Sequence, residues 1–148
     1  ADATYNEITR AAEIACIHND ILQFSEGYET VVGERGVSLS GGQKQRISIA
    51  RALLTNAEIL ILDDCLSAVD AKTEETILNA LKRERAGKTT IITAHRLSAI
   101  QHANLILVVD EGRIVQRGTH EQLMEERGWY KEMYESQQLE ALVEKGGV

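Results

Sequence analysis

The apolar run at residues 59–62, Ile-Leu-Ile-Leu, constrains the fold of this chain more than any other feature. It lies between two charged residues, Glu58 and Asp63. A continuous apolar run of this length is typical of a strand that is covered on both faces, as the strands of a parallel sheet are. We therefore expect a strand in the interior of a largely parallel sheet.

Three further strands and several helices are predicted along the rest of the chain. The strands are expected at residues 89–93, 105–109 and 113–117, with a tight turn at Glu111-Gly112 between the last two. Capping-box pairs, Thr4 with Glu7 and Thr119 with Gln122, mark two helix starts. Helices are expected from Thr4 onward and over residues 20–24, 41–54, 70–85, 119–127 and 129–144, with a loop over residues 27–39. Strands that alternate with helices predict an α/β fold.

Charge and cysteine content narrow the class of protein. Sixteen Lys and Arg against 23 Asp and Glu give a formal net charge of −7, which argues against nucleic acid or an anionic membrane as the main partner. Cys16 and Cys65 have neither metal-ligand nor paired spacing, so we expect free thiols in a reducing cytosol. No apolar run reaches the roughly 18 residues of a membrane span, so any membrane role is expected to come through a partner domain.

Ser40, Gly41 and Gly42 stand at the start of the predicted helix over residues 41–54. Glycines let a ligand approach the backbone, and a helix N-terminus offers N–H groups and a partial positive charge. With the serine hydroxyl as a further donor, the site suits a phosphate. The alternative, which the local residues alone favour, is that Ser40 simply caps the helix, as many serines do.

Four acidic or thiol side chains follow the apolar run. Asp63 stands at the C-terminal end of the strand, where open α/β sheets bind ligands, and its carboxylate can hold Mg²⁺ through water. A merely solvated strand end is the alternative. Asp64 is expected to point to the opposite face of the strand. Cys65 is expected to be unreactive, because acidic neighbours raise the pKa of a thiol. Asp70 is expected to cap the helix that follows.

Several segments, taken in order, resemble the motifs of ATP-binding-cassette (ABC) ATPases of the exporter branch. Leu39-Ser-Gly-Gly-Gln43 matches the signature motif of that family letter for letter. Residues 59–64 resemble a Walker B strand, residues 67–70 resemble the D-loop, and residues 93–97 resemble the switch-histidine segment. Residues 30–36 are similar to the segment that touches coupling helices in exporters, and residues 118–123 and 128–130 continue the likeness. The resemblance covers residues 28–138.

The resemblance implies a fold and a division of the chain. The fold would be a P-loop NTPase (RecA-like) core with a mostly parallel sheet and flanking helices, plus part of the helical signature subdomain. Residues 1–54 would be the helical segment that carries the signature. Residues 55–128 would be the C-terminal half of the ATPase core, and residues 129–148 a C-terminal helical tail.

The resemblance also implies a role for each candidate residue. The set that would bind the ATP of a partner domain in trans is Leu39, Ser40, Gly41, Gly42, Gln43 and Asp70. Asp63 would hold Mg²⁺ through water, and Asp64 would polarise the attacking water. His95 would sense the γ-phosphate from a place beside both aspartates, whereas the other three histidines are expected to be structural. The family usually has Glu where this chain has Asp64, and a misplacement of about 1 Å can cost about 10²-fold in rate.

The 148 residues contain no Gly-x-x-x-x-Gly-Lys-Ser/Thr sequence and no glutamine loop, so we expect a C-terminal piece of an ABC domain that is inactive alone. The implied function is ATP binding and hydrolysis by a head-to-tail pair of nucleotide-binding domains, coupled to export. The implied partners are a second, different nucleotide-binding domain, as in a heterodimeric bacterial exporter, and a transmembrane domain upstream. The implied place is the cytoplasmic face of the bacterial cell membrane.

Two other functions stay open at this point. One is a soluble ABC-type ATPase of DNA repair or chromosome maintenance, although residues 93–97 and 118–130 favour the exporter. The other is a non-catalytic module that only donates its signature. In the family's sheet the P-loop strand lies between the strands at residues 89–93 and 105–109. Without it we expect apolar edges that close on each other or pair with a second copy, so that the chain self-associates.

Overall fold

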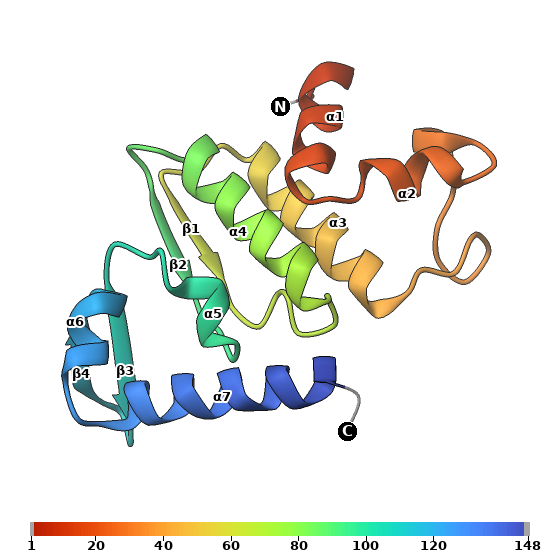
Figure 1. The fold of residues 1–148 in the computed structure, drawn as a ribbon. Helices are drawn as coiled ribbons and strands as arrows, with labels where there is room; N and C mark the ends of the chain where they lie inside the picture. Colours follow the sequence, from red (N-terminus) through yellow and green to blue (C-terminus); the bar gives the residue numbers. More distant parts are fainter. Residues whose placement is uncertain (1, 147–148) are drawn as a thin grey trace. The chain divides into compact units, whose positions relative to one another are not determined.

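The computed structural model describes residues 2–146 and divides into two compact units, with the boundary between Ala94 and His95. The predicted α/β class is confirmed, because helices and short strands alternate along both units (Figure 1). The strands form two separate two-stranded sheets, one in each unit. The expected closure of the strand edges, or their pairing with a second copy, stays a prediction.

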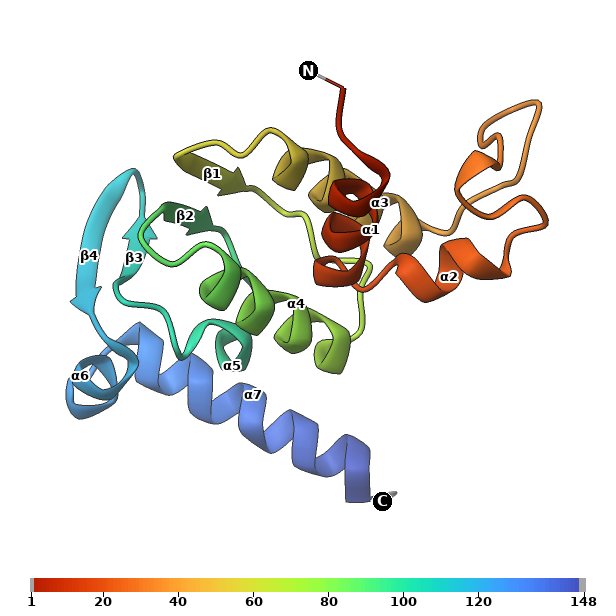
Figure 2. The same ribbon diagram turned by 90° about the horizontal axis from the view of Figure 1, so that it is seen from above.

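The first unit contains most of the helices. Its elements are α1 (Tyr5–Ile14), α2 (His18–Gln23), the 3-10 turn η1 (Gly27–Glu29), α3 (Gly41–Leu54), β1 (Ile59–Leu62), α4 (Ala71–Glu84) and β2 (Thr89–Ile92). The capping box at Thr4 and Glu7 is present, and α3 has the predicted bounds. Helix α1 packs on α3, and α4 runs alongside the β1–β2 pair (Figures 1 and 2).

Strands β1 and β2 are parallel, in a register that pairs Ile59 with Thr89 and Leu62 with Ile92. Leu60 and Leu62 are buried, but Ile59 and Ile61 are 61% and 63% exposed. The prediction of strands covered on both faces is therefore wrong for this chain. The reason is that the described residues supply packing partners for one face of the pair only.

The second unit is built around an antiparallel hairpin. Its elements are α5 (Leu97–Ile100), β3 (Ile106–Asp110), β4 (Arg113–Gly118), α6 (His120–Glu125) and α7 (Trp129–Gly146). Glu111 and Gly112 both have positive φ, 46° and 74°, which is the type I′ geometry that two-residue hairpins favour and confirms the predicted turn. The capping box at Thr119 and Gln122 is also present.

The core of this second unit is small and aromatic at its centre. Tyr130 and Leu123 are fully buried and are surrounded by Leu97, Ile106 and Val108. The hydroxyl of Tyr130 lies 2.8 Å from Nδ1 of His120, so this histidine is structural, as expected. No helix of residues 2–146 combines the length and the apolar character that a bilayer crossing requires.

Candidate nucleotide-binding site

The signature segment, residues 39–43, forms the capped start of α3. The backbone N–H of Gln43 donates to Oγ of Ser40 at 3.2 Å, and the N–H of Ser40 donates to Oε1 of Gln43 at 3.0 Å. The capping role of Ser40 is therefore confirmed. The N–H groups of Gly41 and Gly42 belong to the first turn, where an α-helix has no partner of its own for them. This end of α3 thus presents backbone donors and one hydroxyl that can still donate its hydrogen.

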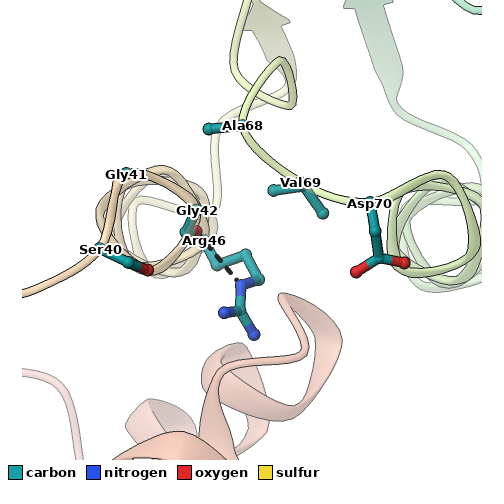
Figure 3. A pocket seen from close by; sticks show the side chains of 7 residues that line it. All are labelled: Ser40, Gly41, Gly42, Arg46, Ala68, Val69 and Asp70. Atoms are coloured by element: carbon teal, nitrogen blue, oxygen red, sulfur yellow. Dashed lines mark hydrogen bonds between the residues drawn. The ribbon is translucent and has the colours of Figure 1, made fainter.

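A hollow of about 320 Å³ lies in front of that helix end. Its walls come from two segments, the start of α3 and the loop before α4, and the lining residues are Ser40, Gly41, Gly42, Arg46, Ala68, Val69 and Asp70. Figure 3 shows Ser40 and Asp70 on opposite walls, with the side chain of Arg46 reaching between them. The signature segment and residues 67–70, which the sequence predicted to share one ligand, do border one space.

The glycines of the signature segment also make room for the loop. A Cβ atom on Gly42 would lie 2.8 Å from the carbonyl oxygen of Ala68, closer than real Cβ contacts allow. A Cβ atom on Gly41 would lie 3.4 Å from the Cβ of Ala68, which is an ordinary contact. Gly42 is therefore required by packing within this chain, independently of any ligand.

Asp20 on α2 holds the signature helix from the other side, which the sequence did not predict. Its Oδ2 accepts hydrogen bonds from Nε2 of Gln43 and from Nη2 of Arg46, both at 3.1 Å. The guanidinium of Arg46 also donates to the carbonyl oxygens of Cys16 and Gly42, at 2.6 Å and 3.2 Å. These bonds fix the polar end of α3 against α2.

The two aspartates after β1 are exposed, and a threonine from β2's end organises them. Oγ1 of Thr93 donates to Oδ1 of Asp63 at 2.9 Å and accepts from the backbone N–H of Asp64 at 3.0 Å. Because β1 ends at Leu62 and Asp64 has a φ of 51°, strand alternation does not govern the direction of the Asp64 side chain. The alternation rule therefore does not apply to Asp64, and the direction of its side chain relative to Asp63 stays a prediction.

The chemistry of this strand end fits a magnesium ion that is held mainly by water and phosphate. Asp63 offers one exposed carboxylate, and Mg²⁺ in nucleotide sites is usually bound through one or two carboxylates and several waters. Within the part of the chain that the structure describes, no group of three or more His, Cys, Asp or Glu side chains forms a closed metal site. The donors at the start of α3 likewise fit phosphate oxygens.

Asp70 is the N-cap of α4, as predicted. Its carboxylate accepts from the backbone N–H of Thr73 at 2.9 Å and from the hydroxyl of Thr73 at 2.7 Å. These bonds to the charged form lower the pKa of Asp70 below its ordinary value. Asp70 therefore faces the hollow as a carboxylate while it stabilises the start of α4.

Cys65 and Cys16 are both free thiols. Partial burial raises the pKa of the Cys65 thiol, and the charges of Asp63 and Asp64 add to that effect. The prediction of an unreactive Cys65 agrees with this direction, because only the thiolate is a strong nucleophile.

His95 is the first residue of the second unit, and a residue of α7 holds its backbone. Nε2 of Gln137 donates to the carbonyl oxygen of His95 at 2.7 Å, while Oε1 of Gln137 accepts from the N–H of Leu97 at 2.9 Å. Asp63 and Asp64 belong to the first unit, so the expected place of His95 beside them stays a prediction. Sequence reasoning gave no role to Gln137, since a polar residue on a tail helix carries no local signal.

Comparisons with known proteins agree with one another. The family model described as ABC transporter matches residues 5–67. The chain is 59% identical over 143 residues to the multidrug resistance-like ATP-binding protein MdlA of Escherichia coli, which covers 97% of this chain and 24% of that protein. It is 58% identical over 146 residues to the probable multidrug resistance ABC transporter ATP-binding/permease protein YheI of Bacillus subtilis, covering 99% of this chain and 25% of that protein.

A solved structure of a bacterial Atm1-family ABC exporter with ATP bound matches the fold with a TM-score of 0.81. The two share 44% sequence identity, over 91% of this chain and 24% of the exporter chain. The chain thus spans about a quarter of the length of the curated relatives and of the solved exporter that it matches.

Proposed function

Since this chain belongs to the family of ABC transporter ATP-binding proteins, we propose that it binds and hydrolyses ATP together with a partner domain and so drives export across a membrane. The observation that carries the proposal is the shared hollow: the signature segment and residues 67–70 border one space of about 320 Å³. The relatives named above are multidrug-resistance and exporter proteins, which supports export over DNA repair.

In this proposal the start of α3 acts on the nucleotide of the partner. The hydroxyl of Ser40 and the N–H groups of Gly41 and Gly42 donate to phosphate oxygens, where the partial positive charge of the helix N-terminus also acts. Leu39 and Gln43 complete the segment: the side chain of Gln43 is bound to Asp20 and closes the capping box, so it keeps these donors in place.

The strand end at Asp63 and Asp64 acts on the chain's own nucleotide. Asp63 would hold Mg²⁺ through water, and that ion supplies charge neutralisation on the phosphate oxygens. Asp64 orients and polarises the attacking water, and His95 donates to the γ-phosphate. Because aspartate is one methylene shorter than glutamate, we propose that this half-site is the slower of two unlike halves in a heterodimer. The assembly would lie at the cytoplasmic face of the bacterial cell membrane, joined to a transmembrane domain.

Ser40→Ala in the full-length transporter, reconstituted with its partner in vesicles, tests the proposal. We expect ATP hydrolysis at the partner's site and extrusion of a fluorescent drug to fall together. Ser48→Ala, on an exposed position of the same helix, is the matched control. Equal hydrolysis in the two variants would contradict the proposal, and so would a wild-type protein that hydrolyses no ATP.

A further inference from the structure

Gln45 lies two residues beyond the signature segment, which ends at Gln43, and binds the loop after β1 at three points. Its Oε1 accepts from the backbone N–H of Ala68 at 2.8 Å. Its Nε2 donates to Oγ of Ser67 at 2.9 Å and to the carbonyl oxygen of Asp64 at 3.4 Å. The side-chain amide of Gln45 therefore links α3 to Asp64, two residues after the end of β1, and also to Ser67 and Ala68.

The chemistry of these contacts fixes the orientation of the amide. The N–H of Ala68 can only donate and the carbonyl oxygen of Asp64 can only accept, so the oxygen of Gln45 must face Ala68 and its nitrogen must face Asp64. An ester-like or apolar side chain cannot satisfy both groups. The arrangement is specific for a neutral amide of this length.

The loop is confined on its other sides as well. The backbone N–H of Asp64 is bound to Thr93, and the carbonyl oxygen of Ala68 lies against Gly42 of the signature segment. The left-handed backbone of Asp64, with φ of 51°, is a conformation that aspartate tolerates better than most residues but that still needs support from its surroundings. The bond from Gln45 to the carbonyl oxygen of Asp64 acts at that very residue.

We propose that Gln45 is a positioning residue that holds Asp64 and residues 67–70 in one arrangement with the signature helix. The consequence is that the part of the chain that serves the partner's nucleotide and the part that serves its own nucleotide move as one body. This inference rests on the proposed function for its kinetic consequence, but the loop's attachment to α3 does not depend on it.

The first test needs no nucleotide turnover. In the full-length, nucleotide-free transporter, amide hydrogen exchange of residues 64–69 is compared between Gln45→Met and Lys44→Met, which places the same side chain at the exposed neighbouring position. We expect exchange to rise about fivefold in Gln45→Met, the factor that one hydrogen bond typically contributes, and to stay unchanged in Lys44→Met. Equal exchange in the two variants would overturn the proposal.

The second test separates positioning from binding. Gln45→Met should lower kcat by about tenfold to a hundredfold, as small misplacements of reacting groups do, while KM for ATP stays within about twofold of wild type. Gln45→Glu keeps an acceptor for the N–H of Ala68 but cannot donate to the carbonyl oxygen of Asp64. Its kcat should therefore lie between that of wild type and that of Gln45→Met. A loss confined to KM, or a Gln45→Glu variant no better than Gln45→Met, would contradict the assigned role.

Two outcomes are kept apart by this design. A wild-type transporter without ATPase activity would refute the proposed function, whereas an active wild type with Gln45→Met equal to Lys44→Met in both assays would refute the inference alone. If Gln45→Met fails to fold, Ser67→Ala removes one of the three contacts from the loop side. Unchanged exchange of the Ala68 amide in Ser67→Ala and unchanged kcat would then refute the positioning role.

Discussion

Replacement of Gly42 by alanine tests the packing between the signature helix and the loop most directly. The new Cβ atom would lie 2.8 Å from the carbonyl oxygen of Ala68 and 3.6 Å from its carbonyl carbon. To restore an ordinary contact, the loop or the helix must move by about half an ångström. The loop resists this movement, because the N–H of the same Ala68 is bound to Gln45.

Two opposing effects set the change in stability that alanine causes at these glycines. Overpacking of this kind typically costs about 1–3 kcal/mol, and alanine gains up to about 1 kcal/mol over glycine in a helix. Gly41→Ala is the matched control, since its Cβ would meet Ala68 at 3.4 Å and create no overlap. We therefore expect Gly42→Ala to be less stable than Gly41→Ala by about 1–3 kcal/mol.

Urea unfolding of the two variants of the 148-residue chain, followed by far-ultraviolet circular dichroism, measures this difference. In the full-length transporter, Gly42→Ala should also slow hydrolysis at the chain's own half-site, because the displaced loop carries Asp64 with it. Stabilities that agree within about 0.5 kcal/mol, the usual scatter of neutral substitutions, would refute the packing argument. Loss of hydrolysis at the partner's site alone would refute the claim that the loop follows the helix.

Three further predictions concern other parts of the chain. Asp64→Glu should raise or leave unchanged the turnover of its own half-site, measured by site-resolved nucleotide trapping. A clear fall in turnover would contradict the argument that the shorter aspartate side chain slows this half-site. The same variant should lower the unfolding midpoint slightly, because the backbone there has a φ of 51°. Burial raises the pKa of Tyr130 from 10.0 to about 12, so the second unit should be fully stabilised below pH 10 and should lose that stabilisation as the pH rises toward 12. Ultraviolet absorbance of tyrosinate measures the ionisation that causes this loss. Unfolding that sets in without ionisation of Tyr130 would refute the prediction. The 148-residue chain alone should self-associate, through the exposed apolar faces of its sheets, and should bind Mg-ATP weakly; light scattering at two concentrations and calorimetry test this, and a clean monomer or a micromolar dissociation constant would be a refutation.

The parts of the fold that depend on neighbours in sequence could be predicted. Helix α3 has the bounds expected from its residues, because Ser40 and Gln43 carry a start signal that acts over three positions. The hairpin turn at Glu111 and Gly112 was predictable for the same reason. The covering of β1 was not, because an apolar run states only that a strand can be buried on both faces. Which faces are covered depends on which other segments are present.

The site shows the same division between local and distant interactions. Ser40 and Asp70 cap their helices as their positions predict, whereas the roles of Asp20, Gln45 and Thr93 depend on partners 19 to 30 residues away in the chain. A polar side chain on a helix looks solvent-facing in a sequence, and nothing local distinguishes Gln45 from Lys44. The direction of the Asp64 side chain stays a prediction, because its left-handed backbone, with φ of 51°, lies outside the strand and the alternation rule does not apply there.

The capping box of α3 bears on how mutations at the signature serine should be interpreted. The oxygen of Ser40 accepts the N–H of Gln43, so alanine at this position removes a ligand donor and a helix cap at once. Alanine in place of an N-cap serine costs about 1 kcal/mol, whereas glycine costs only a few tenths. Ser40→Gly therefore removes the hydroxyl with little fraying of α3. The difference in activity between the glycine and alanine variants measures how much of the loss in Ser40→Ala comes from the helix rather than from the missing contact to the nucleotide.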